Sequence, residues 1–275
     1  MNKIAIVGLG MVGGAVAKTF QNPILYDPPK GIGSIDELNE ADIVFICVPT
    51  PYVKGKGCDT SLVEETLKIL KPKIVQDVAP ESHEDLEIPQ AKIVVIKSTV
   101  IPGTTAKLQA KYPQHKILFN PEFLTESTAD QDMNYPERQI IGFTPNSYDV
   151  SRKILKILPL AQEEHIVPSH IAEFAKYACN SWFATKVAKN NELYDIYHAY
   201  RGSGEGFDKV INCISGDKRI GRSHLEIFHN GSRGFGGKCI PKDLNAFLEL
   251  GKELEVDMPI SKATKEYNEK LSPNK

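Results

Sequence analysis

The sequence lacks the features that mark membrane, disulfide-bonded and zinc proteins. No apolar run approaches the roughly 18 residues of a membrane span, and the first residues, MNKIAIVGLG, have no signal-peptide layout. The five cysteines are odd in number and form no C-x-x-C pair, and the seven histidines show no ligand spacing. A formal net charge of −2 provides no basic field for nucleic acid or an anionic membrane. We therefore expect a cytoplasmic protein that binds no metal.

Short apolar runs alternate with helical patterns over the first part of the chain, which is 275 residues long and 41% hydrophobic. The runs that predict strands are 3–7, 23–27, 41–48, 91–98, 116–120 and 138–143. Helical patterns lie around 11–20, 60–71, 102–111 and 147–158. This alternation predicts an α/β fold with a doubly wound parallel sheet. Within it, Cys47 in "IVFICV" indicates a small buried side chain.

The pattern changes near residue 168, after which no strand signal occurs for over thirty residues. Pro168 and the N-cap candidate Ser169 predict one long helix to about residue 200. A helix that is apolar over much of its surface packs against another helix, which can belong to a second subunit. Further helices are predicted at 204–214 and 241–255, and residues 266–275 are expected to be frayed. We predict two domains, 1–165 and 166–275.

The segment "GLGMVG" follows the first strand and opens the first helix, in the G-x-G-x-x-G pattern. Gly8 allows the tight turn, Gly10 lets a pyrophosphate approach the backbone, and Gly13 allows close helix–strand packing. The helix N-terminus at Met11 and Val12 offers amide donors to the phosphates. The turn therefore predicts a dinucleotide site.

Asp27 ends the second predicted strand, nineteen residues after Gly8. A carboxylate there accepts both hydroxyls of an adenosine ribose, and it would repel a 2′-phosphate. The predicted cofactor is therefore NAD. Lys30 is the only nearby cation that favours NADP instead.

The segment "SRGFGGKCIPKD", residues 232–243, places a cysteine behind three glycines. Pro241 is suited to the first helical position, which puts Cys239 just outside a helix N-terminus and Asp243 at the third helical position. The helix dipole, with Lys238 and Lys242 nearby, favours the thiolate of a group whose ordinary pKa is near 8.5. The glycines, which let the backbone fold tightly, are Gly234, Gly236 and Gly237.

Six motifs, in this order, resemble the UDP-glucose/GDP-mannose dehydrogenase family over residues 1 to about 270. They are "FICVPTP" (45–51), "KSTVIPGTT" (97–105), "NPEFLTE" (120–126), "EFAKYACN" (173–180), "RIG" (219–221) and "GFGGKCIPKD" (234–243). The resemblance implies a Rossmann domain followed by an all-α domain similar to that of 6-phosphogluconate dehydrogenase. It also implies a homodimer whose substrate is a nucleotide sugar, UDP-glucose first.

The implied reaction is a four-electron oxidation of the C6 alcohol to a carboxylate, as in polysaccharide biosynthesis. A thiol that adds to the intermediate aldehyde gives a thiohemiacetal, which loses a second hydride to become a thioester that water cleaves. This chemistry gives a reason for Cys239.

The resemblance also implies roles for residues of the other motifs. Lys176 stabilises negative charge on the C6 oxygen, Asn180 holds the sugar or the oxyanion, and Asp243 serves proton transfer and water activation. Glu122 is implied in thioester hydrolysis, and Thr99 lies between cofactor and water. The remaining implied contacts are to the cofactor (Thr50, Thr99, Glu126, Lys242) and to the substrate (Glu122, Phe123, Leu124, Lys176, Asn180, Arg219).

The chain departs from the family pattern at three places. Residue 238 is lysine where the family usually has serine. The segment from Arg219 to Gly234 is longer than usual, so Arg222 and Arg233 are alternatives to Arg219 as the residue that reaches a neighbouring subunit. The chain stops some thirty residues after Asp243, whereas the family continues into a third domain that grips the nucleotide, so a partner chain is one possible source of that domain.

Two other interpretations remain open at this stage. A two-domain hydroxyacid dehydrogenase has similar size and a similar lysine–asparagine pair, but it performs one hydride transfer and needs no cysteine. A non-catalytic NAD-binding remnant has no physical need to keep Cys239, Lys176, Asn180 and Asp243 together.

Overall fold

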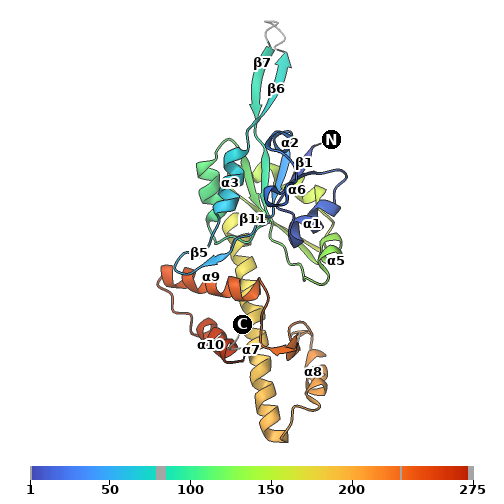
Figure 1. The fold of residues 1–275 in the computed structure, drawn as a ribbon, viewed down its shortest axis with the longest axis vertical. Helices are drawn as coiled ribbons and strands as arrows, with labels where there is room; N and C mark the ends of the chain where they lie inside the picture. Colours follow the sequence, from blue (N-terminus) through green and yellow to red (C-terminus); the bar gives the residue numbers. More distant parts are fainter. Residues whose placement is uncertain (1, 79–84, 230, 272–275) are drawn as a thin grey trace. The chain divides into compact units, whose positions relative to one another are not determined.

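The computed structural model describes residues 2–78, 85–229 and 231–271. By its internal contacts the chain divides into two compact units (Figure 1). The first comprises Met1–Pro51 and Cys58–Lys176, and the second comprises Tyr52–Gly57 and Tyr177–Lys275. The domain boundary at residue 165 stays a prediction, because a division by contacts does not show where an independently folding domain ends.

The first unit contains a seven-stranded sheet in the order β11-β10-β9-β8-β3-β1-β2. Six of these strands agree with the predicted ones, and they are short apolar runs that the structure largely buries, except for the half-buried β2. The strands are β1 (Ile4–Val7), β2 (Ile24–Tyr26), β3 (Ile43–Ile46), β8 (Ile93–Ile96), β9 (Lys116–Phe119), β10 (Arg138–Phe143) and β11 (Glu163–Pro168). The predicted α/β doubly wound architecture is confirmed.

The sheet differs from the prediction in two details. Strand β10 runs antiparallel to β9, with Gly142 opposite Phe119, so the sheet is mixed rather than wholly parallel. Strand β11 is not among the predicted strands, because its sequence "EEHIVP" begins with three exposed polar residues. It is an edge strand with one neighbour, β10, and it therefore needs no continuous apolar run.

Successive residues of each strand point to opposite faces of the sheet, and two separate cores result. One core holds Ala5, Val44 and Val94 together with side chains of α2, α3 and α4. The other holds Ile6, Phe45 and Val95 together with side chains of α1, α5 and α6. The helices are α1 (Met11–Lys18), α2 (Ile35–Asn39), α3 (Ser61–Ile69), α4 (Thr104–Lys111), α5 (Ala129–Asn134) and α6 (Tyr148–Ile157).

Two hairpins interrupt the alternation of strands and helices. Strands β6 (Lys73–Val78) and β7 (Asp85–Gln90) pair antiparallel between α3 and β8. A smaller hairpin, β4 (Tyr52–Val53) with β5 (Gly57–Cys58), follows β3. The sequence predicts neither, since both lie in stretches without a clear apolar period.

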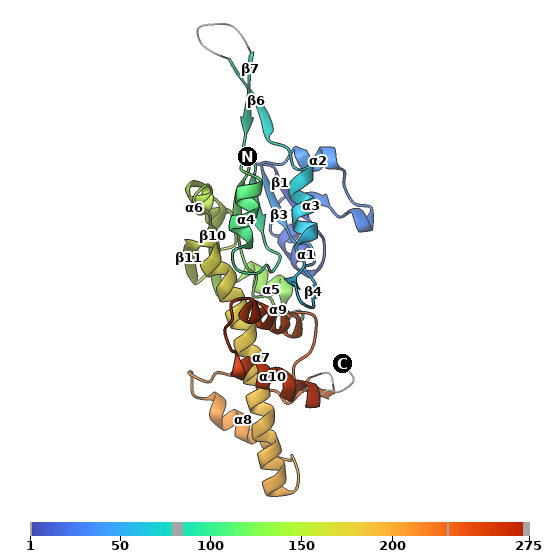
Figure 2. The ribbon, with the colours of Figure 1, turned by 90° about the vertical axis from the view of Figure 1, so that its left-hand side faces the viewer.

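The long helix is confirmed. Helix α7 (Ser169–Arg201) runs unbroken for 33 residues, begins in the first unit and continues through the second (Figure 2). The second unit adds α8 (Phe207–Ser215), the short strands β12 (Phe228–His229) and β13 (Ser232–Arg233), α9 (Ile240–Glu253) and α10 (Pro259–Leu271).

Helix α10 corrects one expectation. The expected fraying of residues 266–271 is wrong, because they form the second half of this helix, whose Thr264 side chain is buried. Residues 272–275 lie outside the described part of the chain. The helix has few apolar residues, so its sequence alone is a weak signal.

Candidate active site

The glycine-rich turn has the backbone geometry that the motif predicts. Gly8 has φ +83°, and a Cβ on Gly13 would lie 1.8 Å from the Gly8 carbonyl oxygen, so a side chain is excluded there. A Cβ on Gly10 would meet nothing within 4 Å, which leaves space for a ligand in front of the turn. Helix α1 begins at Met11 without a side-chain cap, so its first amides have no partner within the helix. These features fit a pyrophosphate.

Asp27, the predicted ribose ligand, also supports the turn. Its Oδ2 accepts a hydrogen bond from the Leu9 amide at 2.8 Å. The Lys30 amine lies 3.6 Å from the same oxygen and donates to the Leu9 carbonyl at 2.6 Å. The cation that could favour NADP is therefore already bound to Asp27 and to the turn. The sequence does not reveal this structural role of either residue.

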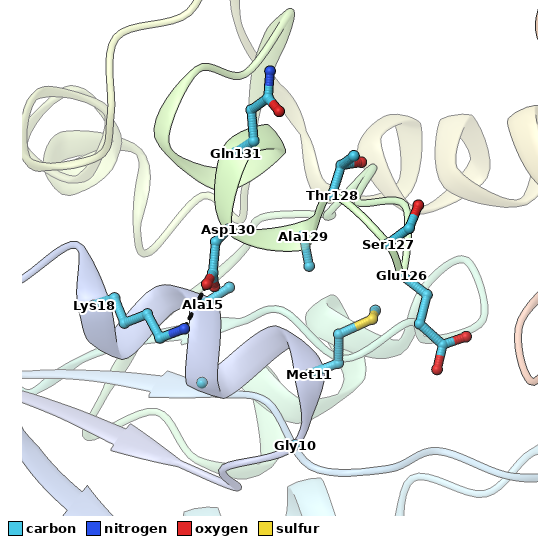
Figure 3. A pocket seen from close by; sticks show the side chains of 11 residues that line it. Gly10, Met11, Ala15, Lys18, Glu126, Ser127, Thr128, Ala129, Asp130 and Gln131 are labelled. Atoms are coloured by element: carbon cyan, nitrogen blue, oxygen red, sulfur yellow. Dashed lines mark hydrogen bonds and ion pairs between the residues drawn. The ribbon is translucent and has the colours of Figure 1, made fainter.

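A cavity of about 520 Å³ opens beside the glycine turn. One face of α1, from Met11 to Lys18, forms one side of it together with Gly10, and residues 126–131 form the other (Figure 3). Gly10, Met11 and Glu126, all predicted to contact the cofactor, line it together. An ion pair of 2.5 Å joins Lys18 to Asp130 at its edge.

Thr50 and Thr99, predicted as cofactor-side residues, are brought together from the ends of β3 and β8. The Thr50 hydroxyl donates to the Thr99 carbonyl at 2.7 Å. The thiol of Cys58 contacts the same carbonyl oxygen at 3.2 Å. The carboxyl ends of adjacent parallel strands meet here, which is where open α/β sheets bind ligands.

Glu122 and Lys176 form a buried ion pair. The Lys176 ammonium donates to Glu122 Oε1 at 3.0 Å and to the Glu122 carbonyl at 2.6 Å, while Glu122 Oε2 accepts from the Leu124 amide at 2.8 Å. The two side chains are 8% and 6% exposed. Burial raises the pKa of Glu122, but Lys176 and the Leu124 amide outweigh it, so the pKa lies below its ordinary value. Glu122 is therefore a carboxylate at neutral pH.

Phe123 lies under two cations. The Lys176 ammonium is 5.2 Å from its ring centroid, and the Arg138 guanidinium is 4.0 Å away. Such contacts attract a cation to the face of an aromatic ring. Phe123 thus helps to hold Lys176 in place.

Lys97 is a buried charged residue that the sequence interpretation misses. Its amine donates to Asn120 Oδ1 at 2.6 Å, and Asn120 in turn donates to the Ile140 carbonyl at 2.8 Å. Burial lowers the pKa of Lys97. Asn120 lies two residues before Glu122, so this chain of bonds holds the "NPEFLTE" segment against β10. The sequence feature that could have indicated a buried lysine is its position directly after the apolar run "IVVI".

Cys47 is not a second nucleophile. A Cβ on Gly13 would lie 3.1 Å from the Cys47 Cβ, which places Cys47 beneath the glycine turn. Burial raises the pKa of Cys47 to about 12, so the thiol stays protonated at neutral pH.

Cys239 is exposed and is the N-cap residue of α9. The Asp243 amide donates to the Cys239 carbonyl at 2.8 Å, which closes the first turn of the helix. The helix starts one residue earlier than predicted, at Ile240. Pro241 is therefore the second helical residue and Asp243 the fourth, rather than the first and third.

Asp243 is the centre of a buried network behind the cysteine. It is 1% exposed. Its Oδ2 accepts from the Asn180 amide at 2.5 Å, and its Oδ1 lies 2.7 Å from the Lys242 ammonium. The structure thus brings together Asn180, Lys242 and Asp243 in the second unit, and Glu122, Phe123 and Lys176 in the first. Lys176 and Asn180 lie one turn apart on α7.

The three arginine candidates differ in exposure. The Arg219 side chain is 91% exposed and pairs with Asp217 at 2.6 Å. Arg222 is exposed and bonds the Asn212 side chain. Arg233 is 24% exposed and pairs with Asp195 at 2.7 Å, so it is already engaged within its own unit. The assignment of Arg219 to a neighbouring subunit's site stays a prediction.

The described residues contain no group of three or more histidine, cysteine, aspartate and glutamate side chains placed to hold a metal ion. Within the same described ranges, no helix has both the length and the apolar character needed to cross a membrane.

Two family models together match most of the chain, from residue 33 to residue 270. Residues 33–158 match the NAD binding domain of the UDP-glucose/GDP-mannose dehydrogenase family, and residues 170–270 match its central domain. The chain belongs to this family. The resemblance carried by the six motifs is confirmed, and with it NAD as the cofactor of the N-terminal half.

Individual relatives agree with the family assignment. UDP-glucose 6-dehydrogenase of Rickettsia conorii is 35% identical over 245 residues, covering 87% of this chain and 51% of the relative. GDP-mannose 6-dehydrogenase of Pseudomonas savastanoi pv. phaseolicola is 29% identical, covering 82% of this chain and 50% of the relative. The chain thus spans about half the length of the curated relatives it matches.

Solved structures show the same fold. A UDP-glucose dehydrogenase from Pyrobaculum islandicum matches with a TM-score of 0.76 and 26% identity, over 98% of this chain and 68% of that chain. A 3-hydroxyisobutyrate dehydrogenase of Mycobacterium tuberculosis matches with a TM-score of 0.69 but 16% identity, over 100% of this chain and 94% of that chain. The second likeness concerns the fold alone.

Proposed function

We propose that this chain is the NAD-binding and catalytic part of a nucleotide-sugar 6-dehydrogenase, with UDP-glucose as the first candidate substrate. The observation that carries the proposal is Cys239, an exposed thiol at the N-terminus of α9 with the buried Asn180–Asp243–Lys242 network behind it. NAD, when bound, supplies the hydride acceptor for each of the two oxidations. The residues that fit it are the glycine turn, Asp27, Thr50 and Glu126.

The first oxidation converts the C6 alcohol to an aldehyde and releases one proton and one hydride. An ammonium has three N–H donors, and Glu122 accepts two of those of Lys176. We assign the third to the C6 oxygen, where it stabilises the charge left as the alcohol loses its proton. Asn180 is assigned to the sugar or the oxyanion.

The second oxidation uses Cys239 as the nucleophile. Its sulfur bonds to C6 of the aldehyde to give a thiohemiacetal, which loses a proton and a hydride and becomes a thioester. The helix N-terminus at Cys239 favours the thiolate that this addition needs. Water then attacks the thioester, with Asp243 and Glu122 assigned to proton transfer and Thr99 to a place between the cofactor and the water, and the carboxylate and the free thiol are released.

A homodimer formed through α7 belongs to the same proposal. Trp182, Leu193, Ile196 and Tyr200 are 72%, 36%, 62% and 81% exposed. Their spacings of eleven, three and four residues place them on one face of the helix. Several large exposed apolar side chains on one helix face are typical of an interface. The proposal also includes the contact of Arg219 with the substrate site of the neighbouring subunit. It further includes a cytoplasmic location and a partner chain that supplies additional contacts to the nucleotide.

The test is the ratio of NADH formed to substrate consumed. The protein is incubated with NAD and separately with UDP-glucose, GDP-mannose and 3-hydroxyisobutyrate. Two NADH per nucleotide sugar, with a uronate product, support the proposal. One NADH per hydroxy acid supports the simpler dehydrogenase, and NAD binding without turnover of any substrate supports the non-catalytic alternative.

A further inference from the structure

The glycine segment before Cys239 is held by a side chain of α10. The Phe235 amide donates to Asn268 Oδ1 at 2.7 Å, and Asn268 Nδ2 donates to the Phe235 carbonyl at 3.0 Å. A carboxamide offers an acceptor and donors side by side, so one asparagine satisfies both backbone groups of one residue, as a neighbouring strand would. The two residues are 33 positions apart in the chain.

Gly234 makes this contact possible. It has φ +78°, a conformation that side-chain-bearing residues rarely adopt. A Cβ on Gly234 would also lie 2.4 Å from Asn268 Oδ1. The backbone and the asparagine therefore both require glycine at this position.

The rest of Phe235 is anchored on the other side. Its ring is 6% exposed and packs with Ala184 and Val187 of α7 and Leu244 of α9. The backbone four residues before Cys239 is thus fixed by a buried ring and by a paired hydrogen bond.

A second contact from α10 braces the residue before Gly234. Tyr267 donates to Asp195 Oδ2 at 2.5 Å, and Asp195 Oδ1 lies 2.7 Å from the Arg233 guanidinium. Burial and the Asp195 carboxylate raise the pKa of Tyr267 to about 12, so its hydroxyl keeps the proton that it donates. Asn268 of α10 therefore contacts this segment directly, and the neighbouring Tyr267 is linked to it through Asp195.

We infer that Asn268 is a positioning residue for Cys239, because it holds the Phe235 peptide and so fixes the glycine segment that leads to the thiol. The inference rests on the proposed function for its link to turnover. Gly236 and Gly237 lie between the anchor and the cysteine, and glycines allow many backbone conformations. Without the anchor, the thiol loses the single placement that a covalent step needs.

The test compares Asn268→Ala and Asn268→Asp with a control, Lys270→Gln, at an exposed position of the same helix. The carboxylate introduced by Asn268→Asp accepts from the Phe235 amide but cannot donate to its carbonyl, so this variant removes one of the two hydrogen bonds. Aspartate has nearly the same shape as asparagine, so Asn268→Asp is expected to fold even if Asn268→Ala does not.

Two measurements need no turnover. Hydrogen exchange of the peptide covering 232–240 should quicken by about five- to a hundredfold in Asn268→Ala, the factor expected for two lost hydrogen bonds, and by less in Asn268→Asp. The rate of alkylation of Cys239 by iodoacetamide, divided by that of the exposed Cys213 on α8 in the same molecule, should change by about threefold or more. Both quantities should be unchanged in Lys270→Gln.

The third measurement is kinetic. With a nucleotide sugar that the native protein oxidises, kcat should fall roughly ten- to a hundredfold in Asn268→Ala, with the dissociation constant for NAD unchanged, and Asn268→Asp should lie between. Unchanged exchange and alkylation overturn the inference, and so does an unchanged kcat alongside faster exchange. If the native protein oxidises no nucleotide sugar, the proposed function fails, while exchange and alkylation still decide whether Asn268 places Cys239.

Discussion

Asp27 combines two tasks in one carboxylate. It accepts a hydrogen bond from the Leu9 amide, which shapes the glycine turn, and it is also the carboxylate predicted to bind the adenosine ribose. Alanine at this position removes both interactions. Asparagine keeps an acceptor for Leu9 and removes only the charge.

We therefore expect Asp27→Asn to raise the dissociation constant for NAD by about ten- to a hundredfold, the factor for one lost charge-assisted hydrogen bond. The preference for NAD over NADP should become smaller. Asp27→Ala should have the same effect on preference and also lower the melting temperature. Calorimetric titration with each cofactor measures this. Native protein that binds NADP as tightly as NAD contradicts the assignment of Asp27 to the ribose.

Cys239 is expected to be essential for the second oxidation. Serine is a far poorer nucleophile and leaving group than a thiolate, so Cys239→Ser should slow or stop turnover at the covalent stage. In Glu122→Gln, where hydrolysis is impaired, a substrate-derived mass should accumulate on the peptide containing Cys239. Four-electron activity at the native rate in the serine variant would remove the cysteine from the mechanism.

The buried Glu122–Lys176 pair should make the free energy of unfolding depend on pH in the acidic range. The folded-state pKa of Glu122 lies below the ordinary value of 4.5, so its stabilising contribution is full above that pH and is lost as the pH falls through the folded-state pKa. Glu122→Gln breaks the buried pair and should cost about 3–5 kcal/mol at pH 7.

Denaturant unfolding of both proteins between pH 7 and pH 3 measures this difference. The gap in the free energy of unfolding should be constant down to about pH 5 and should narrow below about pH 4.5. A gap that stays constant to pH 3 contradicts the buried ion pair.

At the scale of elements, α7 and α9 have different tasks. Cys239 caps the N-terminus of α9, and Asp243 in the first turn accepts a hydrogen bond from Asn180. The residue at which α9 begins therefore fixes both side chains of the proposed site. Helix α7 continues beyond Asn180 for another twenty-one residues, of which several apolar ones are exposed. The proposed dimer interface would account for the part of α7 that lies beyond Asn180.

We expect the native protein to be a dimer in light scattering, and Trp182→Glu to be a monomer, because a charge within an apolar interface is costly to bury. The control is Leu160→Glu, which places the same charge at a residue that is 83% exposed in the first unit. This control should stay dimeric. Dimerisation unaffected by Trp182→Glu would show that another surface forms the interface.

At the scale of the whole molecule, this chain matches only about half the length of its relatives. The NAD-binding domain is matched over most of its length, so the 275 residues should bind NAD with ordinary micromolar affinity. A nucleotide sugar carries a base and two phosphates, and its full recognition is expected to need contacts beyond these residues.

We therefore expect the 275 residues alone to bind UDP-glucose several powers of ten more weakly than a full-length relative, since each missing charge-assisted hydrogen bond is worth about 1.5–3 kcal/mol and ~1.4 kcal/mol is tenfold. Separate calorimetric titrations with NAD and UDP-glucose measure this. Tight UDP-glucose binding would mean that residues of this chain, such as Lys238, make the phosphate contacts themselves.

The sequence by itself determined the features that depend on local backbone geometry. The roles of Gly8 and Gly13 can be predicted because their turn excludes side chains. That of Cys239 can be predicted because a helix with a proline in its first turn follows it. The buried strands are recognisable as continuous apolar runs. Strand β11 and helix α10 are not, because an edge strand and a polar surface helix need no such run.

Only the tertiary structure decided which side chains support these features. Asp27 meets Leu9 across 18 positions, Lys97 meets Asn120 across 23, and Asn268 meets Phe235 across 33. An asparagine or a lysine carries no local sign of its distant partner, since the same side chain is equally at home in solvent. Packing brings the two segments together, and burial then requires each polar group to find its hydrogen bond.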